Sequence, residues 1–114
     1  MEDCIFCKIA NKEINSEILY EDEFVVAFKD LEPQAPVHIL IVPKKHIASL
    51  NELTAADAEL LARIVLAAQK LAKDNGIAER GYRLVNNCGI EGGQTIGHLH
   101  FHLLGGREML WPAG

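Results

Sequence analysis

The segment from His98 to Leu104 alternates between histidine and apolar residues, and it constrains the fold more than any other part of the chain. It reads His-Leu-His-Phe-His-Leu-Leu. Successive side chains of a β-strand point to opposite faces, so His98, His100 and His102 are expected on one face and the apolar side chains between them on the other. The pattern therefore predicts a strand in a sheet that has one packed face and one histidine-bearing face.

Other segments complete a predicted α+β fold. Runs rich in β-branched, aromatic or aliphatic residues predict strands at residues 17–20, 24–28, 37–42 and 82–86, besides 98–104. A long helix is predicted from Thr54 to Asn75, because Thr54 and Asp57 form a capping pattern, apolar residues recur at helical spacing, and Gly76 follows. A short helical turn is expected at residues 6–10. Strands that precede a single long helix favour a five-stranded antiparallel sheet over alternating βαβ units.

Length and charge narrow the classes of protein. The 114 residues are expected to form a single domain, residues 1–114, that buries roughly two-thirds of its unfolded surface. A net charge of -5 argues against binding of polymeric nucleic acid, which needs clustered Lys and Arg. The longest apolar stretch, residues 37–43, is far shorter than the ~20 residues that cross a membrane. We therefore expect a cytoplasmic protein without membrane contact.

The histidine segment has three interpretations. A solvated polar face is disfavoured, since such faces normally carry Thr, Lys and Glu. A metal site is possible because histidine is the commonest metal ligand. The third interpretation is phosphorus chemistry, in which a neutral imidazole attacks while its neighbours hold the developing charge. Residues 92–95, Gly-Gly-Gln-Thr, favour this third interpretation, because glycines let unpaired main-chain N–H groups approach a phosphate oxygen.

Cys4 and Cys7 are spaced C-x-x-C, which leaves zinc ligation, redox cycling and chance as explanations. A redox dithiol should follow a strand, and nothing strand-like can precede residue 4, so redox cycling is disfavoured. A tetrahedral structural zinc needs two further ligands. Cys88 has no evident partner and is expected to be a small packed hydrophobe.

Four separated blocks of the chain resemble the histidine-triad (HIT) superfamily. They are Cys-Ile-Phe-Cys-Lys-Ile at residues 4–9, Phe-Lys-Asp-Leu-Glu-Pro-Gln-Ala-Pro-Val-His at 28–38, Val-Pro-Lys-Lys-His at 42–46, and Gly-Gly-Gln-Thr-Ile-Gly-His-Leu-His-Phe-His-Leu-Leu-Gly-Gly-Arg at 92–107. With Met109, Trp111 and Pro112, the last block is more similar to the HINT branch of nucleoside phosphoramidases than to the dinucleoside polyphosphate hydrolases. The resemblance implies a homodimer in which the two sheets join and the segment through Trp111 approaches the partner's site.

The resemblance also implies a reaction. His100 would attack the α-phosphorus of a purine nucleoside 5′-phosphoramidate, such as adenosine 5′-monophosphoramidate, and carry the nucleotidyl group until water releases it. His102 would contact the phosphate, and His38 would orient the catalytic rings. No catalytic cofactor is implied.

The implied nucleotide site has three parts. The matching residues are Asp30 and Leu31 for the ribose, Asn87, Gly93, Gln94 and Thr95 for the phosphate and further polar contacts, and Ile5, Phe6, Ile9, Ile14 and Phe28 for an apolar base slot. Some members of the superfamily also carry a structural zinc. Here the matching ligands are Cys4, Cys7, His46 and His98. His98 would then be a metal ligand rather than an acid–base participant.

Three other functions stay open at this point. They are hydrolysis of dinucleoside polyphosphates, nucleotide-binding regulation with incidental hydrolysis, and zinc-dependent hydrolysis with the triad as ligands. The chain also departs from the family pattern. Gly97 stands where a bulky residue often precedes the triad, which would enlarge the space beside the site, and Asn86 replaces a more usual apolar residue. The leaving group and the choice between adenine and guanine are therefore open.

Overall fold

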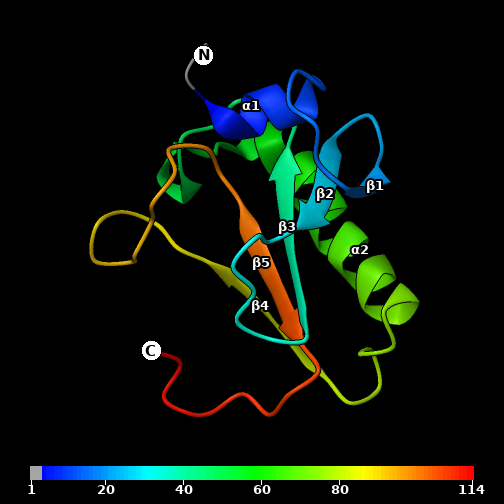
Figure 1. Ribbon diagram of the computed structural model, residues 1–114. Coiled ribbons are helices and arrows are strands. Elements are labelled where there is room, and N and C mark those ends of the chain that lie inside the picture. Colours follow the sequence, from blue (N-terminus) through cyan, green and yellow to red (C-terminus); the bar gives the residue numbers. More distant parts are fainter. Residues whose placement is uncertain (1–3) are drawn as a thin grey trace.

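Five strands form one antiparallel sheet in the computed structural model, which describes residues 4–114. They are β1 (Ile18–Glu21), β2 (Val25–Lys29), β3 (Val37–Pro43), β4 (Tyr82–Asn86) and β5 (Phe101–Gly105), in the order β1-β2-β3-β5-β4 across the sheet (Figure 1). All neighbouring pairs are antiparallel. With the short helix α1 (Ile5–Ala10) and the long helix α2 (Ala58–Asp74), this arrangement confirms the predicted α+β fold.

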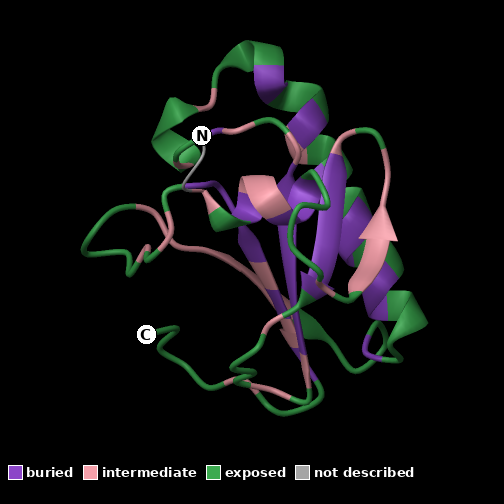
Figure 2. Ribbon diagram, turned by 45° about the horizontal axis from the view of Figure 1, so that its top comes forward, coloured by how far each residue is buried: buried purple, intermediate pink, exposed green. Residues whose placement is uncertain are grey.

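Different helices cover the two faces of the sheet. α2 is buried along the side that faces the sheet and exposed along the other (Figure 2). Its Ile64 belongs to the same core cluster as Ile41 of β3. On the opposite face, Phe6 of α1 packs in a second cluster with Leu40 of β3. The sheet thus separates a large core under α2 from a smaller cluster under α1.

The alternation of the histidine segment decides which face carries the imidazoles. Leu99, Phe101 and Leu103 all lie in the core under α2. The rings of His98 and His100 instead contact Phe6 of α1, with centroid distances of 5.9 and 5.0 Å. The prediction that the histidines share one face and the apolar residues the other is confirmed.

The predicted capping residues define the start of α2. Thr54 and Asp57 form a capping box around a 3₁₀ turn (Ala55–Asp57), and α2 begins at Ala58. Gly76 has a φ of +73°, the left-handed conformation that commonly ends a helix. The helix of residues 54–75 predicted from sequence is therefore 58–74 with its caps. No helix within residues 4–114 is long and apolar enough to span a membrane.

The last strand is shorter than predicted, because it begins at Phe101 rather than at His98. Two main-chain carbonyls that a ladder would use are occupied by side chains. The His98 carbonyl accepts a hydrogen bond from His100 Nδ1 at 2.7 Å, and the His100 carbonyl accepts one from Asn86 Nδ2 at 2.9 Å. Side-chain bonds that compete with the ladder in this way explain the late start of β5.

Candidate active site

Three imidazoles form a row on the α1 face of the sheet. The ring centroids of His38 and His102 are 5.2 Å apart, and those of His102 and His100 are also 5.2 Å apart. β3 supplies His38 and β5 supplies His102, and the register places His102 opposite Leu40, two residues beyond His38. Residues that are 64 positions apart in the chain thus become neighbours through strand pairing.

Main-chain groups set the proton positions at one end of this row. The Gln34 main-chain N–H donates to His38 Nδ1 at 3.0 Å, so Nδ1 must carry the lone pair and Nε2 the proton. His38 Nε2 then donates to His102 Nδ1 at 2.9 Å. His102 consequently carries its proton on Nε2, which is the nitrogen left free to donate to a ligand.

His100, in the middle of the histidine segment, is in the opposite tautomer. His100 Nδ1 lies 2.7 Å from the His98 carbonyl oxygen, which can only accept, so Nδ1 carries the proton. The lone pair of His100 is therefore on Nε2. A lone pair on one ring next to an N–H on the adjacent ring is the arrangement that a nucleophile and a charge-stabilising donor require.

A cavity of about 430 Å³ lies beside these rings. Its apolar wall includes Ile5, Phe6, Ile9 and Phe28, all predicted for the base slot. The polar part of its lining includes Asp30, Thr95, His38 and His102, and Leu31 stands almost fully exposed at its edge. A cavity of about 420 Å³ elsewhere, lined by Gly76, Arg80 and Arg107 among others, contains no histidine. The two cavities have similar volumes, so the residues that line the first one, rather than its size, make it the candidate site.

His100 is buried and does not line this cavity, because the rings of Phe6 and His102 stand beside it. Within residues 4–114, Asn86 Oδ1 is the buried side-chain polar atom that lacks a hydrogen-bond partner. The ring of His102 does line the cavity, and its centroid lies 5.2 Å from that of His100. His100 is thus next to the cavity, one ring away from its lining.

The loop of residues 87–97 corrects one expectation. The main-chain N–H groups of Gly93 and Gln94 donate to the carbonyls of Ile90 and Gly89, so the prediction of unpaired N–H groups at these two positions is wrong. A tight loop closes on itself because its own carbonyls are the nearest acceptors. A Cβ at Gly92 would collide with the main chain of Cys88, which explains a glycine there.

Some predicted binding residues lie outside the cavity. Asn87, Gly93 and Gln94 do not line it, nor does Ile14. The structure adds Ser16, Leu40, Ile96 and Gln34 to its wall. Sequence offered no signal for Gln34, since its contribution to the row of rings is a main-chain N–H. Asn86 differs from the family pattern in the sequence, and in the structure its side-chain amide donates to the carbonyl of His100.

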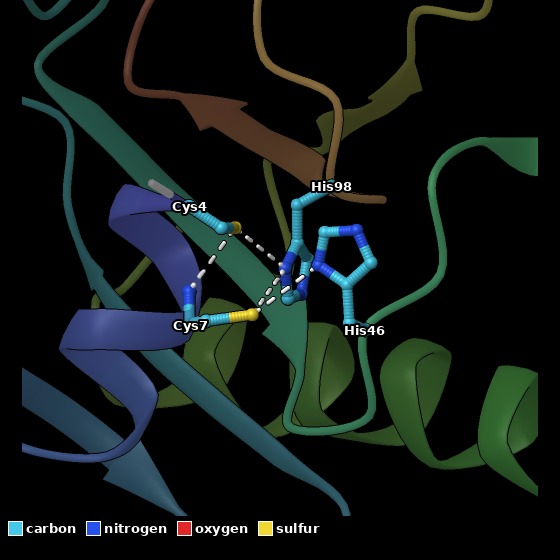
Figure 3. A group of neighbouring side chains, drawn as sticks. All are labelled: Cys4, Cys7, His46 and His98. Atoms are coloured by element: carbon cyan, nitrogen blue, oxygen red, sulfur yellow. Dashed lines mark hydrogen bonds between the residues drawn. The ribbon is translucent and has the colours of Figure 1, made fainter. Parts of the chain in front are cut away.

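The two N-terminal cysteines face two histidines (Figure 3). Cys4 Sγ lies 3.2 Å from His98 Nδ1, and Cys7 Sγ lies 3.2 Å from His46 Nδ1 and 3.5 Å from His98 Nδ1. All four potential ligand atoms are within 4.8 Å of one another. Ligand bonds of about 2.0–2.3 Å to a tetrahedral zinc place ligand atoms roughly 3.3–3.8 Å apart, so the spacing suits such an ion.

The proton positions support this fit. His98 Nε2 lies 2.8 Å from the Pro43 carbonyl and must donate to it, which leaves the lone pair on Nδ1, facing the sulfurs. Burial and the neighbouring Cys4 raise the pKa of the Cys7 thiol to about 11, and a bound divalent cation would overcome this by stabilising the thiolate. Two sulfurs and two imidazoles, of which His98 turns its lone pair toward the sulfurs, form a donor set typical of structural zinc.

A second cluster, Asp30, His38 and His102, has its ligand atoms equally close together. Its proton positions do not fit a metal. His38 Nδ1 is occupied by the Gln34 N–H, so His38 Nε2 bears the proton and has no lone pair to offer. Asp30 Oδ2 also lies 3.4 Å from His38 Nε2. This cluster is therefore better described as a hydrogen-bonded row than as a metal site.

Burial lowers the pKa of His38 and of His102 below 6.5, because the charged rings would lose solvation. The rings of His100 and His38 lower the pKa of His102 further, whereas the Asp30 carboxylate acts in the opposite direction on both. Both rings are consequently neutral at pH 7, as the donor–acceptor row requires.

Comparison with known proteins identifies the family. Residues 3–111 match the family model described as "Scavenger mRNA decapping enzyme C-term binding". The chain is 52% identical to an uncharacterized HIT-like protein of Synechococcus elongatus, over 99% of this chain and 98% of that one. The chain belongs to the HIT superfamily. The chain is also 48% identical to the purine nucleoside phosphoramidase of Escherichia coli K12, over 95% of this chain and 91% of that enzyme.

Solved structures agree with this assignment. A HIT family hydrolase from Legionella pneumophila superposes with a TM-score of 0.96 at 54% identity, covering 98% of this chain and all of the other. One from Clostridium thermocellum gives 0.93 at 56% identity, covering 96% and 95% of the two chains. The resemblance inferred from the four sequence blocks is thereby confirmed.

The lowered pKa values predict a pH dependence of stability. An unfolded chain keeps ordinary histidine pKa values near 6.5, so below that pH it binds more protons than the folded protein. The free energy of unfolding should therefore fall as the pH drops through 6.5, and His38→Gln should make this dependence shallower. Urea unfolding between pH 8 and pH 5.5 measures it. Identical slopes for the variant and the wild type would contradict the account.

Proposed function

We propose that this HIT protein hydrolyses the phosphorus–nitrogen bond of purine nucleoside phosphoramidates, with adenosine 5′-monophosphoramidate as a representative substrate. The observation that carries the proposal is the pair of proton positions: a lone pair on His100 Nε2 and a proton on His102 Nε2. The 48% identity to a purine nucleoside phosphoramidase supports the same conclusion. The reaction needs no catalytic cofactor, because an imidazole is the nucleophile.

The cavity suits a nucleotide in both size and lining. Its volume of about 430 Å³ lies in the range of roughly 300–1,000 Å³ usual for small-molecule sites. The purine would lie against Phe6, Ile9 and their apolar neighbours, and the ribose hydroxyls would donate to Asp30. One oxygen of Asp30 already accepts from the Glu32 N–H at 2.8 Å, which holds the carboxylate in place. Thr95 and His102 would donate to the phosphate. Asn87, Gly93 and Gln94 belong to the same loop as Thr95 and would support it from outside the cavity.

Hydrolysis takes two displacement steps at the phosphorus. The lone pair of His100 Nε2 forms a bond to the α-phosphorus, the P–N bond breaks, and the departing nitrogen takes one proton from solvent to leave as an amine. A water oxygen then bonds to the phosphorus, the Nε2–P bond breaks and returns its electron pair to the ring, and one water proton goes to solvent. The nucleoside monophosphate is released.

His100 and His102 have different tasks in these steps. When His100 bears the phosphoryl group its ring becomes cationic, and the His98 carbonyl, 2.7 Å from Nδ1, stabilises that charge. His102 Nε2–H donates to the phosphoryl oxygens, where negative charge develops. His38 is a positioning residue, since its own N–H keeps the proton of His102 on Nε2. A single fixed donor at a developing charge contributes about 10²–10³ in rate.

Replacing the nucleophile should separate chemistry from binding. His100→Gly should abolish turnover of adenosine 5′-monophosphoramidate while AMP still binds within about tenfold of the wild-type affinity, because the base and ribose contacts remain. Steady-state kinetics and calorimetric AMP titration test this, with His38→Gln as the comparison, which should retain partial turnover. Mass spectrometry of wild-type enzyme quenched in denaturant at alkaline pH, where the N–P bond survives, should locate the nucleotidyl group on His100. Wild-type turnover in the glycine variant would disprove the assignment, and faster release from a diadenosine polyphosphate would favour the other hydrolase branch.

The cysteine–histidine group is proposed to hold one structural zinc. Cys4, Cys7, His46 and His98 would bind the ion, which would supply a cross-link between α1 and the segment that precedes β5. α1 carries Phe6 of the base slot, and the carbonyl of His98 orients His100. The cross-link would therefore support both halves of the active site without touching the substrate.

Removal of zinc should lower stability before it affects chemistry. A zinc concentration a thousandfold above its dissociation constant adds about 4 kcal/mol to the free energy of unfolding, and a chelator should remove that increment. Thermal unfolding with and without chelator measures it. Cys7→Ser should bind no zinc and lose the response, while Cys88→Ser, a matched cysteine outside the group, should keep it. Loss of activity on chelation at an unchanged melting temperature would instead indicate a catalytic metal.

Two copies of the chain are proposed to pair through β4. This strand lies at the edge of the sheet next to β5, so its outer main-chain groups are available to a second strand. Tyr82 on β4 is 40% exposed, and Trp111 in the C-terminal segment is 84% exposed. Both side chains would be covered in a dimer, with Trp111 near the partner's site.

The mass in solution tests the dimer. Sedimentation equilibrium at micromolar concentration should give twice the mass of the chain. A proline at position 85 of β4, Val85→Pro, should shift the protein toward the monomer, because proline cannot donate to a ladder. A wild-type protein that sediments as a monomer throughout would contradict the pairing.

A further inference from the structure

The segment Gly-Gly-Arg at residues 105–107 ends β5 and packs against the loop of residues 30–36, which joins β2 to β3. Gly106 has a φ of +91°, and a Cβ at this position would lie 2.9 Å from Cβ of Pro36. A side chain at position 106 would therefore strain the backbone and push the two segments apart. Their close approach brings the next residue, Arg107, to the loop.

Arg107 donates to main-chain carbonyls. Its Nε donates to the Gln34 carbonyl at 2.9 Å, and its Nη1 donates to the Glu108 carbonyl at 3.1 Å. Within residues 4–114, no ion pair involves Arg107. A guanidinium is planar and its donors have fixed directions, so these two bonds hold the main chain of Gln34 at a set position.

Few other contacts hold this loop in place. Residues 31–34 and 36 are exposed, so apolar packing contributes little there. Local hydrogen bonds join the Glu32 N–H to Asp30 at 2.8 Å and the Gln34 side chain to the Glu32 carbonyl at 3.0 Å. In the part of the chain that the structure describes, the bond from Arg107 is the one hydrogen bond between residues 31–35 and any residue beyond His38.

The residue that Arg107 holds is also the one that assigns the protons of the imidazole row. The Gln34 main-chain N–H donates to His38 Nδ1 at 3.0 Å, and His38 Nε2 donates to His102 Nδ1 at 2.9 Å. Three hydrogen bonds in series thus connect Arg107 with His102. Without the Gln34 N–H, His38 can carry its proton on Nδ1 and turn a lone pair toward His102. The proton of His102 then belongs on Nδ1, and its Nε2 has no hydrogen to donate to a phosphate.

We propose that Arg107 is a positioning residue for the phosphoryl chemistry of this protein: it holds Gln34 where the main-chain N–H keeps His38 and His102 in the tautomers that the reaction needs. The inference rests on the proposed phosphoramidase function. Arg107 does not line the cavity beside the rings, so it acts on the rate and not on nucleotide binding. Asp30, the proposed ribose contact, is held separately, because its main-chain N–H donates to the His38 carbonyl at 3.1 Å.

The cavity of about 420 Å³ supplies a matched control, because Arg80 and Arg107 both line it and both are exposed. Arg107→Met removes the charge together with the bond to Gln34. Arg80→Met removes the same charge from the same cavity, and no hydrogen bond joins Arg80 to the loop within residues 4–114. Arg107→Lys keeps the charge and a donor without the planar geometry, so it should recover part of what Arg107→Met loses.

Steady-state hydrolysis of adenosine 5′-monophosphoramidate and calorimetric titration with AMP separate chemistry from binding. A fixed donor at a developing charge contributes about 10²–10³ in rate, and Arg107→Met should lower kcat by about tenfold to a hundredfold, because only part of the molecules keep that donor. AMP affinity should stay within about threefold of the wild type, since the base and ribose contacts remain. Arg80→Met should match the wild type in both measurements, and Arg107→Lys should have an intermediate kcat.

Nitrogen-15 NMR of the histidine rings in the full-length chain at pH 7.5 observes the tautomers directly, because protonated and unprotonated ring nitrogens resonate at different frequencies. His38 and His102 should carry their protons on Nε2 in the wild type and in Arg80→Met, and shift toward Nδ1 in Arg107→Met. His100 is the internal reference. Its proton should stay on Nδ1 in every protein, because its partner is the His98 carbonyl.

Several results would overturn the role of Arg107 while leaving the phosphoramidase function intact. They are a wild-type kcat in Arg107→Met, a lowered kcat with unchanged tautomers of His38 and His102, and an equal loss of kcat in Arg80→Met. A wild type that hydrolyses no phosphoramidate would overturn the phosphoramidase function itself, and the NMR comparison would still test the hold of Arg107 on the row. If Arg107→Met unfolds, as shown by its melting temperature, Arg107→Ala carries the same expectations.

Discussion

Main-chain hydrogen bonds to the imidazole rings are the constraint on which the chemistry of this protein depends. A carbonyl can only accept and an N–H can only donate, so each such contact assigns the proton of one ring. The His98 carbonyl, the Pro43 carbonyl and the Gln34 N–H assign His100, His98 and His38 in turn. Four rings of one residue type thereby acquire different properties, because His102 takes its assignment from His38.

The same assignments distinguish two clusters that distance alone would treat alike. Both place histidine and other ligand atoms within 4.8 Å of one another. In one of them His98 turns a lone pair toward two sulfurs, whereas in the other His38 turns a proton toward His102. The first is fit to hold a metal and the second to orient a reacting ring. The proposed zinc ligand His98 and the proposed nucleophile His100 are thus only two residues apart in the chain, yet their rings are set up for different tasks.

The two faces of the sheet have different tasks, because one packs the large core and the other bears the candidate active site. Its α2 face contains the large core, to which β5 contributes only apolar side chains. Its α1 face combines the smaller cluster with the imidazoles and the cavity of about 430 Å³ beside them. The side chains of β5 alternate between the two faces of the sheet. Packing of its apolar side chains in the core therefore also fixes the position of the His102 ring on the opposite face. α1 has only six residues, so the contacts of Phe6 and the cysteines, rather than its length, determine where it lies.

The sequence alone determined the class of the fold, the limits of most elements and the face on which the histidines lie, because period-two alternation and helix capping are local rules. Through four matched blocks it also pointed to the cysteine–histidine group. Tertiary structure decided the rest. Strand pairing brought His38 to His102, loop closure engaged the N–H groups of Gly93 and Gln94, and side-chain bonds delayed β5 to Phe101. These contacts join residues distant in sequence or involve main-chain groups that every residue carries, so no local pattern of side chains could report them.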